Sequence, residues 1–95
     1  MLELLETIPL SPRGEKILSI LASSNHPMPV TRVVDRTFED DWDPPLDAMG
    51  VVKVTLCRLR PRLKQHGLEV VNISGMTGEV VRNTGSHYQL RRIAQ

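Results

Sequence analysis

The sequence predicts an α+β domain in which three helices precede a β-hairpin or a three-stranded wing. Helix signals, namely capping residues and apolar residues spaced by three or four, occupy residues 11–65. After Gly67 the pattern becomes strand-like, with runs of valine and isoleucine separated by turn residues. We therefore expect one domain over residues 11–92 and an N-terminal segment over residues 1–10.

The first helix is expected to begin after Ser11 and to end near Ser23. Ser11 can cap the helix, and Pro12 suits the first helical position because the amide there has no partner anyway. Residues 24–29 contain two prolines, so we expect a turn there. The inward face of this helix is formed by Ile17, Leu18, Leu21 and Ile20.

A short second helix is expected over residues 32–38, with Thr31 as its N-cap. An acidic loop over residues 39–45, closed by two prolines, would connect it to the third helix. The inward residues of the second helix are Val33, Val34, Thr37 and Phe38.

The third helix is expected over residues 47–65, and Gly67 can adopt the left-handed conformation that ends it. Its apolar residues are spaced by four, three and four, which makes one buried stripe. Pro61 predicts a kink or an early end, because proline removes one helical hydrogen bond. The stripe consists of Val52, Leu56, Leu59 and Leu63. The other positions carry five bases and no acid: Lys53, Arg58, Arg60, Arg62 and Lys64.

Strands are expected over residues 68–73, 79–82 and 87–92, with turns between them. Three helices followed by such strands have the order of a winged helix-turn-helix. In that architecture the third helix enters the major groove of DNA, and the hairpin, or wing, lies beside it.

Charge is distributed unequally along the chain, although the net charge is only +1. Residues 1–49 contain four bases and nine acids, whereas residues 50–95 contain eight bases and two acids. A domain with this charge distribution is suited to bind a polyanion with its basic face and to keep its acidic face away from it. Solvated charge that is clustered by chance is the alternative.

Several classes of protein are not indicated by the sequence. The single cysteine, Cys57, allows no internal disulfide and is typical of a reducing cytoplasm. No apolar run is long enough to span a membrane. The histidines lack metal-ligand spacing with Cys57, and we find no catalytic motif, so no enzyme, metal, cofactor or small-molecule substrate is expected. Cys57 as a redox sensor is the less favoured alternative to a small helix residue.

Four segments of the chain resemble one family of regulators. They are Leu-Ser-Pro-Arg at 10–13, Val-Val-Asp-Arg-Thr-Phe at 33–38, Val-Lys-Val-Thr-Leu-Cys-Arg-Leu-Arg-Pro-Arg-Leu at 52–63, and Thr-Gly at 84–85 with Tyr-Gln-Leu at 88–90. Together they are similar to the winged-helix C-terminal DNA-binding (effector) domain of two-component response regulators. The third segment, which matches the recognition helix, is the specific one.

The chain also departs from that family and looks like a stand-alone short form. Only ten residues precede Ser11, where the family has a four-stranded sheet, and no receiver domain is present. Gly50 stands where the family often has arginine. Phosphorylation-controlled dimerisation is therefore not implied.

The resemblance and the basic helix together predict sequence-specific binding of double-stranded DNA by a bacterial or phage transcriptional regulator. The protein would be cytoplasmic and nucleoid-associated, and would act as a homodimer or in tandem copies. Helical angles place base-edge candidates opposite the apolar stripe, namely Lys53, Val54, Cys57 and Arg58. The phosphate candidates are Arg60, Arg62 and Lys64. The remaining predicted DNA contacts are Thr55, Arg32 and, at the wing, Arg82, Asn83, Thr84 and His87.

The alternative function is that of a protein-interaction adaptor. It would dock through the acidic loop or through Leu2, Leu4 and Leu5 of the N-terminal segment. In the resembling family this loop can contact RNA polymerase, and a plain solvated linker is the alternative. Trp42 would be either an exposed anchor or a residue packed on Phe38. The predicted interaction residues are Asp40, Asp41, Trp42 and Asp43.

Overall fold

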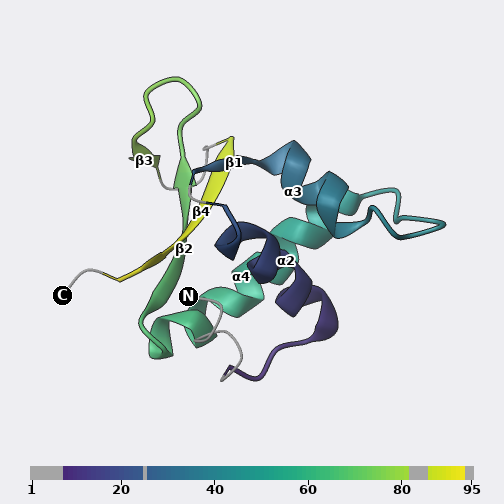
Figure 1. The fold of residues 1–95 in the computed structure, drawn as a ribbon, viewed down its shortest axis with the longest axis horizontal. Helices are drawn as coiled ribbons and strands as arrows, with labels where there is room; N and C mark the ends of the chain where they lie inside the picture. The colour runs from purple at the N-terminus through teal and green to yellow at the C-terminus, as the bar shows by residue number, and fades with distance from the viewer. Residues whose placement is uncertain (1–7, 25, 82–85, 94–95) are drawn as a thin grey trace.

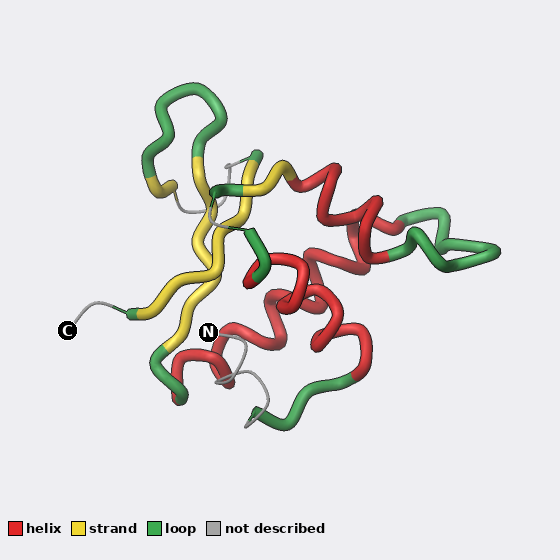
Figure 2. Tube along the Cα trace, in the orientation of Figure 1, coloured by secondary structure: helices red, strands yellow, loops and turns green. Residues whose placement is uncertain are grey.

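The computed structural model describes residues 8–24, 26–81 and 86–93. This part of the chain is α+β, with three helices and one four-stranded antiparallel sheet. Figure 1 shows the sheet at one side of the molecule and the helices at the other, and Figure 2 marks the loops that connect them. The helices are α2 (Pro12–Ala22), α3 (Val30–Thr37) and α4 (Ala48–Gln65), and the strands are β1 (Met28–Pro29), β2 (Leu68–Ile73), β3 (Val80–Val81) and β4 (His87–Arg92).

The strand order in the sheet is β1-β4-β2-β3. The longest pairing joins β2 to β4, from Leu68 opposite Arg92 to Ile73 opposite His87. The short strand β3 pairs with the end of β2 on its other edge. The predicted strands over 68–73 and 87–92 are confirmed, and the described part of the middle strand is limited to Val80 and Val81.

α4 is the central element, because it contacts α2, α3 and β2. Its apolar stripe is fully buried, as predicted, and consists of Val52, Leu56, Leu59 and Leu63. α2 crosses α4 closely at Gly14, where a Cβ atom would lie only 3.1 Å from Leu59 Cδ1. The glycine that weakens the first turn of α2 therefore allows the two helices to approach each other.

The ends of α2 and α4 follow the sequence signals. Ser11 caps α2, and its hydroxyl oxygen accepts a hydrogen bond from the Gly14 amide at 3.1 Å. Asp47 caps α4 in the same way. Gly67 follows α4 with a φ of 76°, and its amide donates to the Lys64 carbonyl at 3.1 Å. These positions confirm the predicted start of the first helix and the predicted end of the third.

Two predictions between α2 and α4 are wrong. Residues 28 and 29 form β1 rather than a turn, with Met28 opposite Tyr88 in β4. A two-residue strand has no visible periodicity, and proline is compatible with a strand at the edge of a sheet. Thr31 does not cap α3, which begins at Val30 and has Pro29 as its N-cap without a side-chain bond. The Val30 amide donates to the Ser86 carbonyl at 2.9 Å, so the chain passes directly from the sheet into the helix without a side-chain capping bond.

Of the two outcomes expected at Pro61, a kink or an early end of the helix, the early end is wrong. α4 continues past Pro61 to Gln65, and the proline ring is exposed. Since the buried stripe extends to Leu63, packing against the core maintains the helix across the missing hydrogen bond. None of the helices in the described residues is long and apolar enough to cross a membrane.

Candidate nucleic-acid interface

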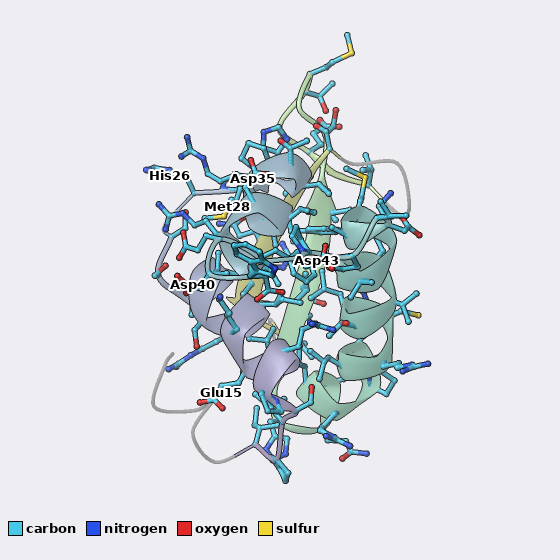
Figure 3. The ribbon with its side chains drawn as sticks, turned by 90° about the vertical axis from the view of Figure 1, so that its right-hand side faces the viewer. Glu15, His26, Met28, Asp35, Asp40 and Asp43 are labelled. Atoms are coloured by element: carbon cyan, nitrogen blue, oxygen red, sulfur yellow. The ribbon has the colours of Figure 1, made fainter. Side chains whose placement is uncertain are left out.

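The side of α4 opposite its buried stripe is exposed to solvent. Figure 3 shows α4 at one edge of the molecule, with a row of side chains that projects away from the other helices. Val54 is 50% exposed, and the Cys57 thiol is free and exposed. The exposed residues of this row, which we call the outward face of α4, are Lys53, Val54, Cys57, Arg58, Pro61, Lys64 and Gln65.

The cations of the outward face have no anionic partner within the described chain. Only two ion pairs occur among the described residues, Lys16 with Asp40 and Arg91 with Glu69. In Figure 3, Glu15 and Asp40 lie on the side of the molecule away from α4, whereas Asp43 lies closer to that helix. The separation of charge in space is therefore partial, because Asp47 also caps α4.

The first turn of α4 is held by its cap. The Asp47 carboxylate accepts a hydrogen bond from the Gly50 amide at 3.1 Å. A Cβ atom on Gly50 would collide with that carboxylate, so only glycine fits here with Asp47 in this position. Thr55, one of the predicted DNA contacts, is half-buried, and its hydroxyl donates to the Val51 carbonyl at 2.7 Å.

The predicted phosphate contacts of α4 differ in their surroundings. Arg60 is half-buried and donates from Nη2 to the Asn72 side-chain oxygen at 3.2 Å. Arg62 is exposed, and its Nη1 donates to the Pro9 carbonyl at 2.6 Å. Lys64 is exposed and has no ion pair with a described residue. Arg60 and Arg62 therefore serve the fold, a role that the sequence analysis did not assign to them.

The predicted wing contacts are only partly described. Arg82, Asn83 and Thr84 lie outside the described residues, as do Leu2, Leu4 and Leu5 of the N-terminal segment. His87 begins β4 and is half-buried, with Nδ1 2.8 Å from the Ser86 hydroxyl oxygen. Arg32 is exposed in the first turn of α3.

The acidic loop between α3 and α4 projects an aromatic side chain into solvent. Trp42 is 99% exposed, so the expected alternative in which it packs on Phe38 is wrong. Leu46 in the same loop is also fully exposed. Of the predicted interaction residues, Asp41 and Asp43 are exposed, and Asp40 forms the pair with Lys16 at 3.5 Å.

One cation beside α4, Arg13, was not among the predicted DNA contacts, although it belongs to the Leu-Ser-Pro-Arg segment at 10–13. Arg13 of α2 lies with its guanidinium carbon 5.2 Å from the centre of the Phe38 ring. It lines a hollow of about 400 Å³ between α2 and the first half of α4, which also contains Arg58. The signal available in the sequence was the position of Arg13 in the first turn of a helix that Ser11 and Pro12 begin.

The described residues contain no group of three side chains suited to bind a metal ion. Comparisons of the chain with protein-family models, with curated proteins and with solved structures found no match.

Proposed function

We propose that this protein binds double-stranded DNA in a sequence-specific manner and regulates transcription. Its three helices and strands would form a winged helix-turn-helix in which α3 and α4 are the helix-turn-helix and the segment between β2 and β4 is the wing. The observation that supports this most strongly is the outward face of α4. It presents Lys53 and Arg58 without an anionic partner in the described chain, while the opposite side of the helix is anchored in the core.

An α-helix fits the major groove of B-DNA, and side chains on its outward side reach the base edges there. Arg58 is suited to guanine, since a guanidinium can donate to O6 and N7 together. Val54 is suited to the methyl group of thymine. Lys64 would hold a phosphate and contribute affinity without sequence information. Lys53, which the sequence places among the base-edge candidates, lies at the edge of the outward face, and we assign it to a phosphate as well.

The proposal extends to the biological setting that the resemblance implies. The protein would act in the bacterial or phage-infected cytoplasm, at the nucleoid. One domain of this size covers a short DNA site, so two copies would bind as a dimer or in tandem.

The test begins with selection of bound sequences from a random duplex pool, followed by titration of the selected duplex. Arg58→Ala should weaken binding by about 1–3 kcal/mol, or roughly 5- to 150-fold, and relax the preference at one base position. Arg91→Ala is the matched control, because its guanidinium is already paired with Glu69 at 2.7 Å. Absence of salt-dependent duplex binding by the wild type at about 50 mM salt would refute the proposal.

A second candidate function is supported by the full exposure of Trp42 and Leu46 in the acidic loop. Exposed tryptophan is a common anchor in protein interfaces. In this alternative the protein is an adaptor that docks through the loop, and RNA polymerase is the partner that the resemblance suggests. A complex that survives high salt and is broken by Trp42→Ala but not by Arg58→Ala would favour the adaptor.

A further inference from the structure

A trough runs along the side of α4 that faces the first turn of α2. Two adjoining hollows, of about 400 and 260 Å³, share Thr55 and Arg58 and together make this α2–α4 trough. Val51 and Val54 form an apolar part of its wall, and Gly50 contributes no side chain. Val54 and Arg58 also belong to the outward face, so the trough adjoins that face.

The polar lining of the trough is mostly cationic. Three arginines, Arg13, Arg58 and Arg62, line it together with one acidic residue, Asp47. The Asp47 carboxylate accepts the hydrogen bond from the Gly50 amide, and one Arg62 nitrogen is bonded to the Pro9 carbonyl. Arg13 and Arg58 form no ion pair with a described residue.

Arg13 is held in place by an aromatic ring. Its guanidinium lies over Phe38, which is buried at the end of α3. Such stacking restricts the side chain before any ligand arrives, so less conformational entropy is lost when the guanidinium donates hydrogen bonds. Asp41 lines a separate small hollow beside Arg13 and Lys16, but it lies beyond ion-pair distance of both.

We propose that the α2–α4 trough seats the sugar-phosphate backbone of one DNA strand, and that Arg13 binds a phosphate in it. A guanidinium matches the geometry of a phosphate with two parallel hydrogen bonds. This inference rests on the proposed function and adds a contact from α2, a helix outside the predicted helix-turn-helix. Because phosphate contacts position the protein, Arg13 contributes affinity on every sequence, whereas Arg58, which lines both hollows and belongs to the outward face, reads a base.

The test is the salt dependence of duplex binding for the wild type, Arg13→Ala, Arg13→Lys and Lys16→Ala. Loss of one phosphate contact lowers the slope of log affinity against log salt by about 0.9. Between about 50 and 200 mM salt, the affinity of Arg13→Ala should therefore fall about threefold less than that of the wild type. The loss at low salt should be the same on selected and unrelated duplexes.

The other two variants separate charge from structure. Arg13→Lys keeps a cation and should keep most of the wild-type slope, even if the stacking on Phe38 is weakened. Lys16→Ala removes a cation one turn further along α2 that is already paired with Asp40, and its slope should equal that of the wild type.

The outcomes distinguish this inference from the function on which it rests. A wild-type slope in Arg13→Ala, together with weakened binding in Arg58→Ala, overturns the role of Arg13 and leaves DNA binding intact. An equal loss of slope in Arg13→Ala and Lys16→Ala, or in Arg13→Ala and Arg13→Lys, also overturns it. Absence of duplex binding by the wild type overturns both.

Discussion

The cations in the two halves of α4 differ in whether they already form hydrogen bonds within the protein. In the part of α4 up to Arg58, the first half, Lys53 and Arg58 are exposed and have no ion pair with a described residue. In the part from Arg60 onward, the second half, Arg60 binds the Asn72 side chain and Arg62 binds the Pro9 carbonyl. Lys64, at the end of the second half, is the exception, because it is exposed and has no ion pair with a described residue. A run of bases that is uniform in sequence is therefore divided by its neighbours in the fold.

The difference shows what decides the role of a basic residue on a helix. β2 packs behind the second half of α4 and brings Asn72 to Arg60, and the chain before α2 passes close enough to bring Pro9 to Arg62. A guanidinium that already donates to the fold must be released before it can hold a phosphate. The first half is thus the better candidate for contact with DNA.

Pro61 lies in the second half, between Arg60 and Arg62, and its replacement should have the largest effect on stability. Pro61→Ala provides an amide that can donate to the Cys57 carbonyl and removes the ring from an exposed helix position. We expect the free energy of unfolding to rise by about 1–3 kcal/mol, as measured by urea denaturation. DNA affinity should change little if the first half of α4 binds on its own; a change above tenfold would show that the halves act together.

Arg60→Ala should have the next largest effect, on stability rather than on binding. It removes a charge-assisted hydrogen bond at a half-buried site, so we expect the free energy of unfolding to fall by about 1–2 kcal/mol. Lys53→Ala is the matched variant in the first half. We expect its free energy of unfolding to be unchanged, and its affinity for DNA to be weaker and less dependent on salt. Denaturation and duplex titration of both proteins would check this pair.

Two results would contradict the conclusion that the first half of α4 binds DNA while Arg60 and Arg62 of the second half stabilise the fold. One is Arg60→Ala with wild-type stability and a loss of DNA affinity as large as that of Arg58→Ala. The other is a loss of stability in Lys53→Ala that exceeds about 0.5 kcal/mol, since surface substitutions away from specific contacts usually stay within this limit.

Arg62→Ala should have a smaller effect, because its bond to the Pro9 carbonyl is exposed. We expect a loss below about 1 kcal/mol in the free energy of unfolding. The change should be local: hydrogen exchange at residues near Ile8, which is buried in the core, should accelerate more than exchange in α4. Arg62→Lys keeps a donor and serves as the control. If exchange instead accelerated uniformly across α4, Arg62 would stabilise the helix itself rather than hold the N-terminal segment in place.

The helices and long strands were predictable from the sequence because their signals are local. Ser11 and Pro12 begin α2, Gly67 ends α4, and Val52, Leu56, Leu59 and Leu63 define the buried side of α4. Each of these signals depends on residues within a few positions of one another.

Several of the errors and omissions involve contacts between distant parts of the chain. β1 forms because Met28 pairs with Tyr88, which follows it by sixty positions in the chain. The start of α3 depends on the hydrogen bond from the Val30 amide to the Ser86 carbonyl. The partners of Arg60 and Arg62, and the approach of Arg13 to Phe38 and α4, are of the same kind. The helical period of the sequence predicted that Arg58 points outward. It could not show which cations already donate hydrogen bonds to other parts of the chain.

The smallest expected effect is a shift in the titration of Tyr88, the only tyrosine in the chain. Burial raises the pKa of its phenol above the ordinary value of 10.0, and the nearby Arg60 charge partly opposes that rise. A pKa that is higher in the folded state favours the protonated phenol, so this contribution to stability is complete below pH 10 and is lost as the pH rises through the folded-state pKa. Tyrosinate absorbance should therefore give a midpoint above 10.0 in the wild type and a still higher midpoint in Arg60→Ala, whereas Lys53→Ala should match the wild type. If Arg60→Ala left the midpoint unchanged or lowered it, the charge of Arg60 would not be directed toward the sheet, and the distinction between the two halves of α4 would lose its main support.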